Sequence, residues 1–144
     1  VREERGSVEV VAEREGVLVS IPLAMTSETL WRVLAHMAAV LTNRDATIIF
    51  EEPEAHSFPY YTKFLAEVIA RDRDNQYFVS THNPYFLASI LEKAPKGDVR
   101  VVVTYWKDGS TRVRVLEGGE LDELLEVDPF FNLERYVPQG TSRV

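Results

Sequence analysis

The sequence contains no cysteine, which excludes a disulfide framework and any zinc site built on thiolates. A metal ion would therefore be held by oxygen or imidazole, and magnesium suits the abundant carboxylates best. No apolar run approaches the roughly 20 residues that a membrane helix requires. The charged opening segment, residues 1–5, is also unlike a secretory signal. We therefore expect a cytoplasmic protein.

Positive charge is scarce too, because 16 lysines and arginines stand against 23 aspartates and glutamates, for a net charge of −7. Proteins that bind nucleic acid directly neutralise its phosphates with clustered cations, so we expect no direct binding and leave contact through a partner open. The length of 144 residues and the 45% hydrophobic content fit one globular domain, residues 1–144. Glutamine and asparagine are few, at two and four residues, which is typical of thermophilic proteins.

The most informative stretch is 47–54, which reads TIIFEEPE. Its first four residues are β-branched or aromatic without alternation, as in a strand covered on both faces of a parallel sheet. Pro53 then stops the strand. Glu51 and Glu52 therefore fall at the carboxyl end of a central strand, where open α/β sheets bind their ligands.

The other segments predict an α/β fold with a mostly parallel sheet flanked by helices and a β-hairpin at each end. Apolar residues at helical spacing predict a helix over 26–41, with Thr26 or Ser27 as its N-cap, and another over 59–71. A strand over 76–80 and a helix over 85–93 repeat the strand-turn-helix plan. The predicted hairpins pair 8–12 with 17–21 and 99–106 with 111–116, and a short helix follows over 121–125.

His82 follows Glu52 by 30 residues, and the interval holds one predicted helix and one strand. If the two strands are neighbours, both side chains emerge at the same sheet edge. A carboxylate there can hold magnesium, a second can orient or deprotonate a water, and an imidazole can hydrogen-bond a phosphate. Plainer roles also exist: the carboxylates could form a solvated turn, and His82 could cap the next helix. His36, on the first helix, reads as a structural or surface residue.

Two segments carry a resemblance to a known family: IIFEEPEAH at 48–56 and STHNP at 80–84. They resemble motifs of the ATP-binding-cassette (ABC) ATPases, especially the AAA-labelled, OLD-like prokaryotic branch related to DNA-repair and chromosome-structure ATPases. The resemblance covers roughly 22–91 and implies a P-loop NTPase-like fold that binds ATP and Mg²⁺. It makes Glu51 the Walker B acid that holds magnesium through water, Glu52 the catalytic glutamate and His82 the switch histidine. The segment 53–56 would form the D-loop, where two such proteins meet across a nucleotide sandwich.

The sequence departs from this family at the phosphate loop. A P-loop requires a glycine-rich segment that ends in Gly-Lys-Ser/Thr, because its backbone N–H groups and lysine cradle the phosphates. None of the seven glycines is followed by lysine. The chain therefore resembles the carboxyl-terminal half of the domain, as a fragment, a split product that pairs with a chain carrying the Walker A half, or a degenerate relative. We expect an oligomer or such a partner chain, and no ATP hydrolysis by this chain alone.

The signature motif departs as well. Its Ser-Gly-Gly-like pattern aligns with Thr26, Ser27 and Glu28, so that a glutamate stands where the family has glycine. In the family this helix start receives the γ-phosphate bound by the opposite subunit. A glutamate adds bulk and repels phosphate, although a carboxylate favours the first turn of a helix. We hypothesise that Glu28 forms a self-satisfied helix cap in place of a phosphate site.

Two other functions stay open. One is a non-catalytic interaction or scaffold module of the same fold, with exposed tail aromatics such as Phe130, Phe131 and Tyr136 as part of its contact surface. The other is a phosphoesterase that depends on a divalent metal. Its ligands would come from Glu51, Glu52, Glu54, His56 and His82.

Overall fold

The computed structural model describes residues 8–137, without the side chains of Arg14 and Leu133. The charged opening segment 1–5 lies outside this range. The centre of the fold is a strand-helix-strand-helix unit, as predicted: β3 (Thr47–Glu51), α2 (Pro59–Arg71), β4 (Gln76–Ser80) and α3 (Pro84–Lys93). Proline in the first turn of α2 and of α3 fixes the start of each helix, because its preset backbone angle suits that position.

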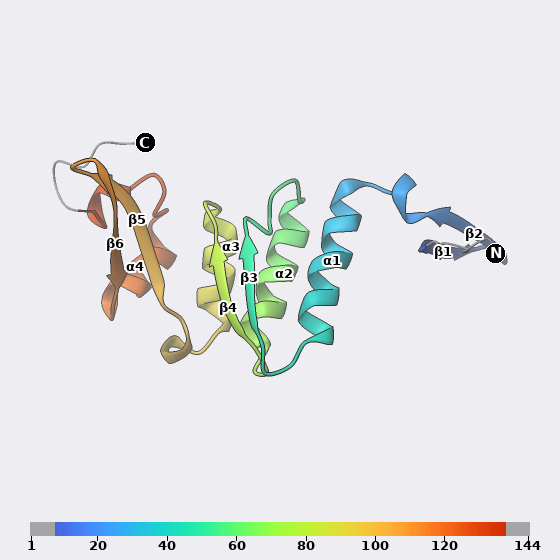
Figure 1. Ribbon diagram of the computed structural model, residues 1–144, viewed down its shortest axis with the longest axis horizontal. Helices are drawn as coiled ribbons and strands as arrows, with labels where there is room; N and C mark the ends of the chain where they lie inside the picture. The colour runs from blue at the N-terminus through green and yellow to red at the C-terminus, as the bar shows by residue number, and fades with distance from the viewer. Residues whose placement is uncertain (1–7, 138–144) are drawn as a thin grey trace, which may run out of the picture.

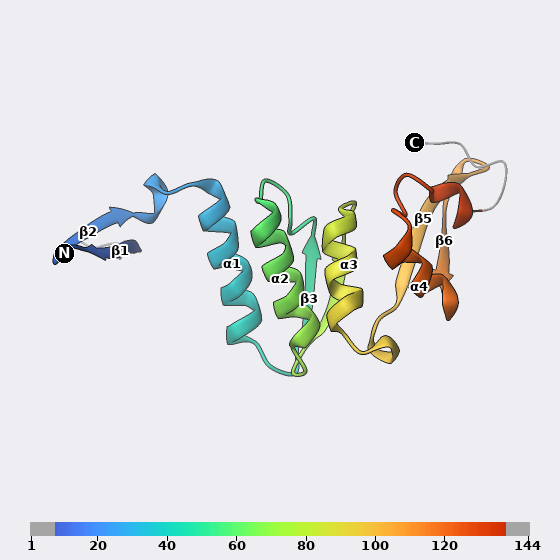
Figure 2. The same ribbon diagram turned by 180° about the vertical axis from the view of Figure 1, so that it is seen from behind.

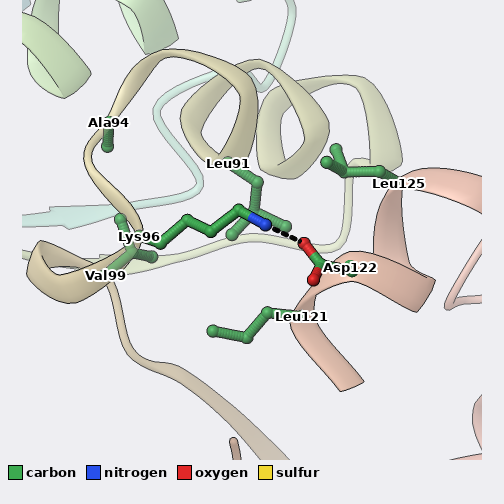
Figure 3. Close-up of a pocket in the computed structure, with 7 residues that line it drawn as sticks. All are labelled: Leu91, Ala94, Lys96, Val99, Leu121, Asp122 and Leu125. Carbon is green, nitrogen blue, oxygen red and sulfur yellow. Dashed lines mark hydrogen bonds and ion pairs between the residues drawn. The ribbon is translucent and has the colours of Figure 1, made fainter. Parts of the chain in front are cut away.

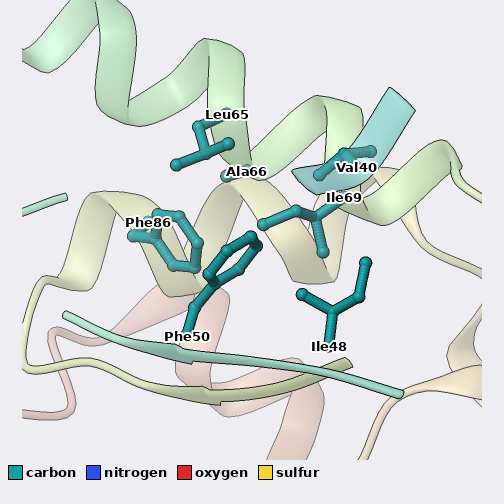
Figure 4. Close-up of a cluster of buried hydrophobic side chains, with 7 residues drawn as sticks. All are labelled: Val40, Ile48, Phe50, Leu65, Ala66, Ile69 and Phe86. Atoms are coloured by element: carbon teal, nitrogen blue, oxygen red, sulfur yellow. The ribbon is translucent and has the colours of Figure 1, made fainter. Parts of the chain in front are cut away.

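β3 and β4 pair in parallel, and α1 (Glu28–Thr42), α2 and α3 all lie on one side of them (Figures 1 and 2). The main core forms between this helical layer and the strands. Ile48 and Phe50 point from β3 into it, as Figure 4 shows, while Phe86 of α3 is 1% exposed. The buried members of this cluster are Val40, Ile48, Phe50, Leu65, Ala66, Ile69 and Phe86.

Two antiparallel hairpins flank the central unit, and both were predicted. β1 (Glu9–Arg14) pairs with β2 (Val17–Pro22), and β5 (Val101–Lys107) pairs with β6 (Ser110–Leu116). Positive φ angles at Asp108 and Gly109, 51° and 74°, match the tight turn that an Asp-Gly pair favours. The described strands form three separate two-stranded sheets, one parallel and two antiparallel, so the prediction of one mostly parallel sheet is not confirmed. The short turns account for this, because only β3 and β4 are joined by a crossover helix.

The carboxyl-terminal part forms a second small core. α4 (Gly119–Glu126) packs against β5 and β6, and Leu116, Leu124 and Tyr136 are buried together. Tyr136 is 1% exposed, so its predicted place on an exposed tail surface is wrong. It belongs to the apolar cluster that contains Leu116 of β6 and Leu124 of α4. Phe131, at 86% exposed, does lie on the surface. Short 3-10 turns at Leu23–Met25, Lys96–Asp98 and Leu133–Arg135 join these parts.

The opposite face of the strands is open. Ile49 and Phe78 are cross-strand partners in β3 and β4, and they are 75% and 57% exposed. β5 and β6 present Val102, Val113 and Val115 in the same uncovered manner. The prediction that β3 is covered on both faces is therefore wrong for this chain, because the described helices all cover one side. We call the uncovered side, with Ile49 and Phe78 at its centre, the open sheet face.

At the amino end of β3 and β4, Asn75 ties the two strands together. Its side-chain oxygen accepts a hydrogen bond from the amide of Ala46 at 3.1 Å, and its side-chain nitrogen donates to the carbonyl of Asn43 at 3.0 Å. The amide of Asp45 also donates to the carbonyl of Asp74 at 2.8 Å. These bonds fix where one strand begins relative to the other. Within the described residues, no helix is both long and apolar enough to span a membrane.

Candidate functional site

The candidate site lies where β3 and β4 end. In their parallel register Glu51 is opposite Ser80, and the amide of Glu52 extends the ladder by donating to the carbonyl of Ser80 at 2.9 Å. The backbone then turns sharply, because Glu52 has a φ of 41° and Pro53 is fully buried. This turn directs the Glu52 side chain away from the strand axis and toward the residues that follow β4.

Glu52 and His82 meet at this edge, as their spacing predicts. The carboxylate Oε1 of Glu52 lies 2.9 Å from Nδ1 of His82, and the two side chains are 46% and 72% exposed. An exposed contact of this kind, whether a hydrogen bond or an ion pair, stabilises a fold by about 1 kcal/mol or less, so stability alone is a weak reason for it. Both groups face solvent and can reach a ligand.

A buried carboxylate, Glu54, links the two turns that carry Glu52 and His82. Glu54 is 5% exposed, and its Oε1 accepts a hydrogen bond from the Thr81 hydroxyl. The same hydroxyl oxygen accepts a bond from the amide of Asn83 at 3.0 Å. Asn83 in turn caps α3 by accepting from the amides of Tyr85 and Phe86. Glu54 is therefore inaccessible as a ligand, and it joins the turn after β3 to the turn after β4.

The signature-like segment lies at the start of α1. Ser27 is the N-cap, and its hydroxyl accepts from the amide of Leu30 at 3.2 Å, whereas Thr26 donates to the carbonyl of Leu23 at 2.6 Å. Glu28 is the first residue of the helix. The capping side chain is thus Ser27 and not Glu28, because the shorter hydroxyl reaches the first free amides. The Glu28 carboxylate adds a negative charge in the first turn, which the helix dipole favours.

Sequence reasoning missed two residues of α1 that contact the turn after β3. Thr29 donates a hydrogen bond to the carbonyl of His56 at 2.8 Å, and Arg32 donates one to the carbonyl of Glu52 at 3.2 Å. A signal existed, because Arg32 and His36 are the only titratable residues in the otherwise apolar run 30–41. Charged residues inside an apolar stripe need a polar partner nearby.

His36 is structural, as predicted. Its ring packs edge-on against Phe50 with the centroids 5.0 Å apart. Burial, and secondarily the positive charge of Arg32, lower the pKa of His36 from its ordinary value of 6.5. His56 is exposed at the end of the turn, with a φ of 59°. Neither histidine lies with His82 in one cluster of metal ligands.

No three histidine or acidic side chains within residues 8–137 gather as a group able to hold a metal ion. Glu51 is exposed at the end of β3, where one oxygen ligand is available. Magnesium in phosphate-transfer sites is held by one or two carboxylates, with phosphate and water supplying the rest. Glu51 fits that shared arrangement and does not fit a self-contained metal centre.

A small cavity lies away from this edge. A cavity of about 20 Å³ between α3 and α4 has room for one water, and an ion pair between Lys96 and Asp122 spans it (Figure 3). Its lining residues are Leu91, Ala94, Lys96, Val99, Leu121, Asp122 and Leu125. The cavity is too small for a nucleotide. The candidate site is instead an exposed edge, open on the side toward solvent.

Comparison with known proteins bears on the fold. No family model and no curated protein matches the chain. A similar solved structure comes from work on ATP-driven dimerisation and DNA-stimulated activation of SMC ATPases. The two chains are 18% identical, with a TM-score of 0.59 over 97% of this chain and 81% of that one. At this identity the likeness concerns architecture alone, and it shows that the chain shares its fold with that structure.

Proposed function

We propose that this chain contributes the water-activating half of an ABC-type ATPase site, and that a P-loop from another segment or chain completes it. The observation that carries the proposal is the contact between Glu52 and His82 at 2.9 Å, at the carboxyl edge of two parallel strands. The fold shared with an SMC ATPase domain supports the same reading. In this role Glu51 is the acidic residue on the magnesium side, Glu52 the catalytic glutamate and His82 the switch histidine.

Each residue has a defined task in this scheme. When bound, magnesium-ATP supplies the phosphoryl group and the cation that balances its charge. Glu52, already placed by its turn, accepts a hydrogen bond from the attacking water and orients it. Glu51 offers a carboxylate to the metal side through water. Ser27 and Glu28, at the start of α1, would face the nucleotide of an opposing subunit, where Glu28 weakens phosphate binding by repulsion.

The protonation of His82 follows from its geometry. A carboxylate can only accept, so the hydrogen of the contact belongs to Nδ1 of His82. If Nε2 is also to donate to a phosphate oxygen, the ring must carry both protons. Glu52 thus orients the His82 ring through the bond to Nδ1, and the other ring nitrogen stays available to the ligand.

The phosphate loop must come from elsewhere, because residues 8–137 contain no Gly-Lys step. The open sheet face, with Ile49 at 75% and Phe78 at 57% exposed, gives such a partner an apolar surface beside the site. β3 and β4 pair only with each other among the described strands, so their outer edges are also available for pairing. Both features favour a partner that carries strands, whether in the same polypeptide or in another.

Calorimetric titration tests the incomplete site. The chain alone should not bind magnesium-ATP at micromolar concentration, because its sequence has no Gly-Lys-Ser/Thr loop to cradle the β- and γ-phosphates. In a complex with a P-loop partner, Glu52→Gln should abolish hydrolysis while nucleotide binding persists, since the amide cannot accept the proton of the attacking water. Glu126→Gln, on the exposed side of α4, is the matched control. Micromolar binding by the chain alone, or hydrolysis by Glu52→Gln, would overturn the proposal.

A non-catalytic interaction module is the second candidate, and the position of Glu28 favours it. A carboxylate in the first turn of α1, next to the Ser27 cap, repels the phosphate that the family binds there. In this case the complex forms but does not depend on Glu52 or His82. Hydrolysis that is absent in the wild-type complex, and restored by Glu28→Gly, would indicate a degenerate ATPase site.

A further inference from the structure

The turn after β3 is held in an unusual conformation. Glu52 and His56 have φ angles of 41° and 59°, in the left-handed region that side chains other than glycine rarely adopt. Between them, Pro53 and Glu54 are buried. A turn of this kind persists only when the surrounding structure fixes it.

The two residues with positive φ are also the ones that α1 contacts. The Arg32 side chain donates to the carbonyl of Glu52 at 3.2 Å, and the Thr29 hydroxyl donates to the carbonyl of His56 at 2.8 Å. Arg32 and Thr29 are three residues apart, so both project from the same side of the helix. They hold the two ends of the turn at once. We call this pair of residues the α1 clamp.

The environment of Arg32 indicates a positioning role. Its Nε atom is buried and has no hydrogen-bond partner within the described residues. A guanidinium placed partly out of water without a carboxylate partner contributes poorly to stability. Its hydrogen bond goes to the carbonyl of Glu52, which also accepts from the amide of Ala55 at 3.0 Å. Those two bonds fix the peptide that follows the Cα of Glu52.

We propose that Arg32 is a positioning residue for Glu52, and that Thr29 fixes the far end of the same turn. This inference rests on the proposed catalytic role of Glu52. The α1 clamp keeps Glu52 in its left-handed conformation, and that conformation directs the carboxylate toward His82. Because the clamp begins two residues after the Ser27 cap, a displacement of the start of α1 moves the Glu52 turn with it.

NMR on the whole chain, without nucleotide, tests the clamp. The test variants are Arg32→Met, which keeps an apolar stem and removes every donor, Arg32→Lys, which keeps one donor group, and Thr29→Val. The matched controls are Arg44→Met, at an exposed arginine 3.9 Å from Asp74, and Thr42→Val, whose hydroxyl bonds only within α1. The readouts are amide hydrogen exchange and the one-bond Cα–Hα coupling of Glu52, which distinguishes positive from negative φ.

In Arg32→Met, the Ala55 amide should exchange about tenfold faster or more. Its acceptor is the carbonyl of Glu52, which the charged Arg32 side chain no longer holds in place. The Cα–Hα coupling of Glu52 should shift toward the value for negative φ, and Arg32→Lys should restore part of it. Thr29→Val should have its main effect at His56 and Ser57. The amide of Phe50, inside β3, should change less than twofold in every variant that stays folded, as should all amides in the two controls.

Two results would overturn the inference. One is a Glu52 coupling and an Ala55 exchange rate in Arg32→Met that equal those of Arg44→Met. The other is a uniform rise in exchange across β3 and α2 with the Glu52 coupling unchanged, which would make Arg32 a general stabilising residue. Neither measurement involves ATP. Hydrolysis of ATP by Glu52→Gln would overturn the proposed function of Glu52. It is therefore a result separate from the test of the α1 clamp.

Discussion

Thr81→Val should destabilise the chain by about 2 to 4 kcal/mol, which is large for a partly exposed residue. The Thr81 hydroxyl is the hydrogen-bond donor to Glu54, whose second oxygen has no partner within the described residues. A hydrogen bond to a charged group contributes about 1.5 to 3 kcal/mol. The substitution also removes the acceptor for the amide of Asn83, which adds up to about 1 kcal/mol.

A double-mutant cycle with Glu54→Leu separates these contributions. Glu54 is 5% exposed, so its carboxylate is not screened by water, and an apolar side chain of similar volume should be tolerated. In the Thr81→Val background, Glu54→Leu should recover about 1.5 to 3 kcal/mol relative to its effect in the wild type. The loss at Asn83 should remain, because both variants that lack the hydroxyl share it.

Urea unfolding, followed by circular dichroism, measures all four free energies. Thr104→Val is the control, because Thr104 is exposed on β5 and should change stability by about 0.5 kcal/mol or less. A coupling energy below about 0.5 kcal/mol would refute the reasoning. It would mean that Thr81 and Glu54 do not form the buried link between the turns after β3 and β4.

Three further predictions concern other parts of the chain. Because the pKa of His36 is lowered in the folded state, the unfolded chain binds more protons than the folded chain below about pH 6.5. Stability should therefore fall as the pH falls through that value. The variant His36→Asn should flatten the plot of melting temperature against pH. A steeper slope would contradict this. Tyr136→Phe should stabilise the chain by up to about 1 kcal/mol in urea, since the buried hydroxyl has no partner within the described residues; a loss of more than about 1 kcal/mol would reveal a bond to that hydroxyl. Phe78→Lys should reduce self-association in sedimentation velocity, whereas Phe131→Lys, off the open sheet face, should not.

Most of the element boundaries could be predicted from the sequence. The strand over 76–80 and the helix over 59–71 agree with β4 and α2, because periodicity, Pro59 and the polar residues 72–75 all mark the same limits. The meeting of Glu52 and His82 was also predictable. It follows from the length of one strand-helix-strand unit, which places both residues at the carboxyl edge of the same parallel pair.

The one-sided layering was not predictable from the sequence. The run Ile48, Ile49, Phe50 indicates cover on both faces, yet the described chain supplies helices for one face only. The composition of a strand indicates how many of its faces suit apolar cover. It does not indicate which segment or chain provides that cover. The positive φ of Glu52 was equally hidden, because turns of this kind usually display glycine or asparagine. Contacts from α1 hold the turn, and contacts between distant segments leave no local pattern.

The Asn75 contacts at the far end of β3 have a consequence for register. Ile48, Ile49 and Phe50 are all apolar, so a slip of β3 by one residue would still bury an apolar side chain, and hydrophobicity specifies the alignment only weakly. The side chain of Asn75 bonds to the Ala46 amide and the Asn43 carbonyl, which removes that freedom. A slip by one residue would place Phe50 or Glu52 opposite Ser80 in place of Glu51, and Glu52 would move by one residue relative to His82. The alignment of the candidate site is thus determined by an amide side chain at the opposite end of the strand.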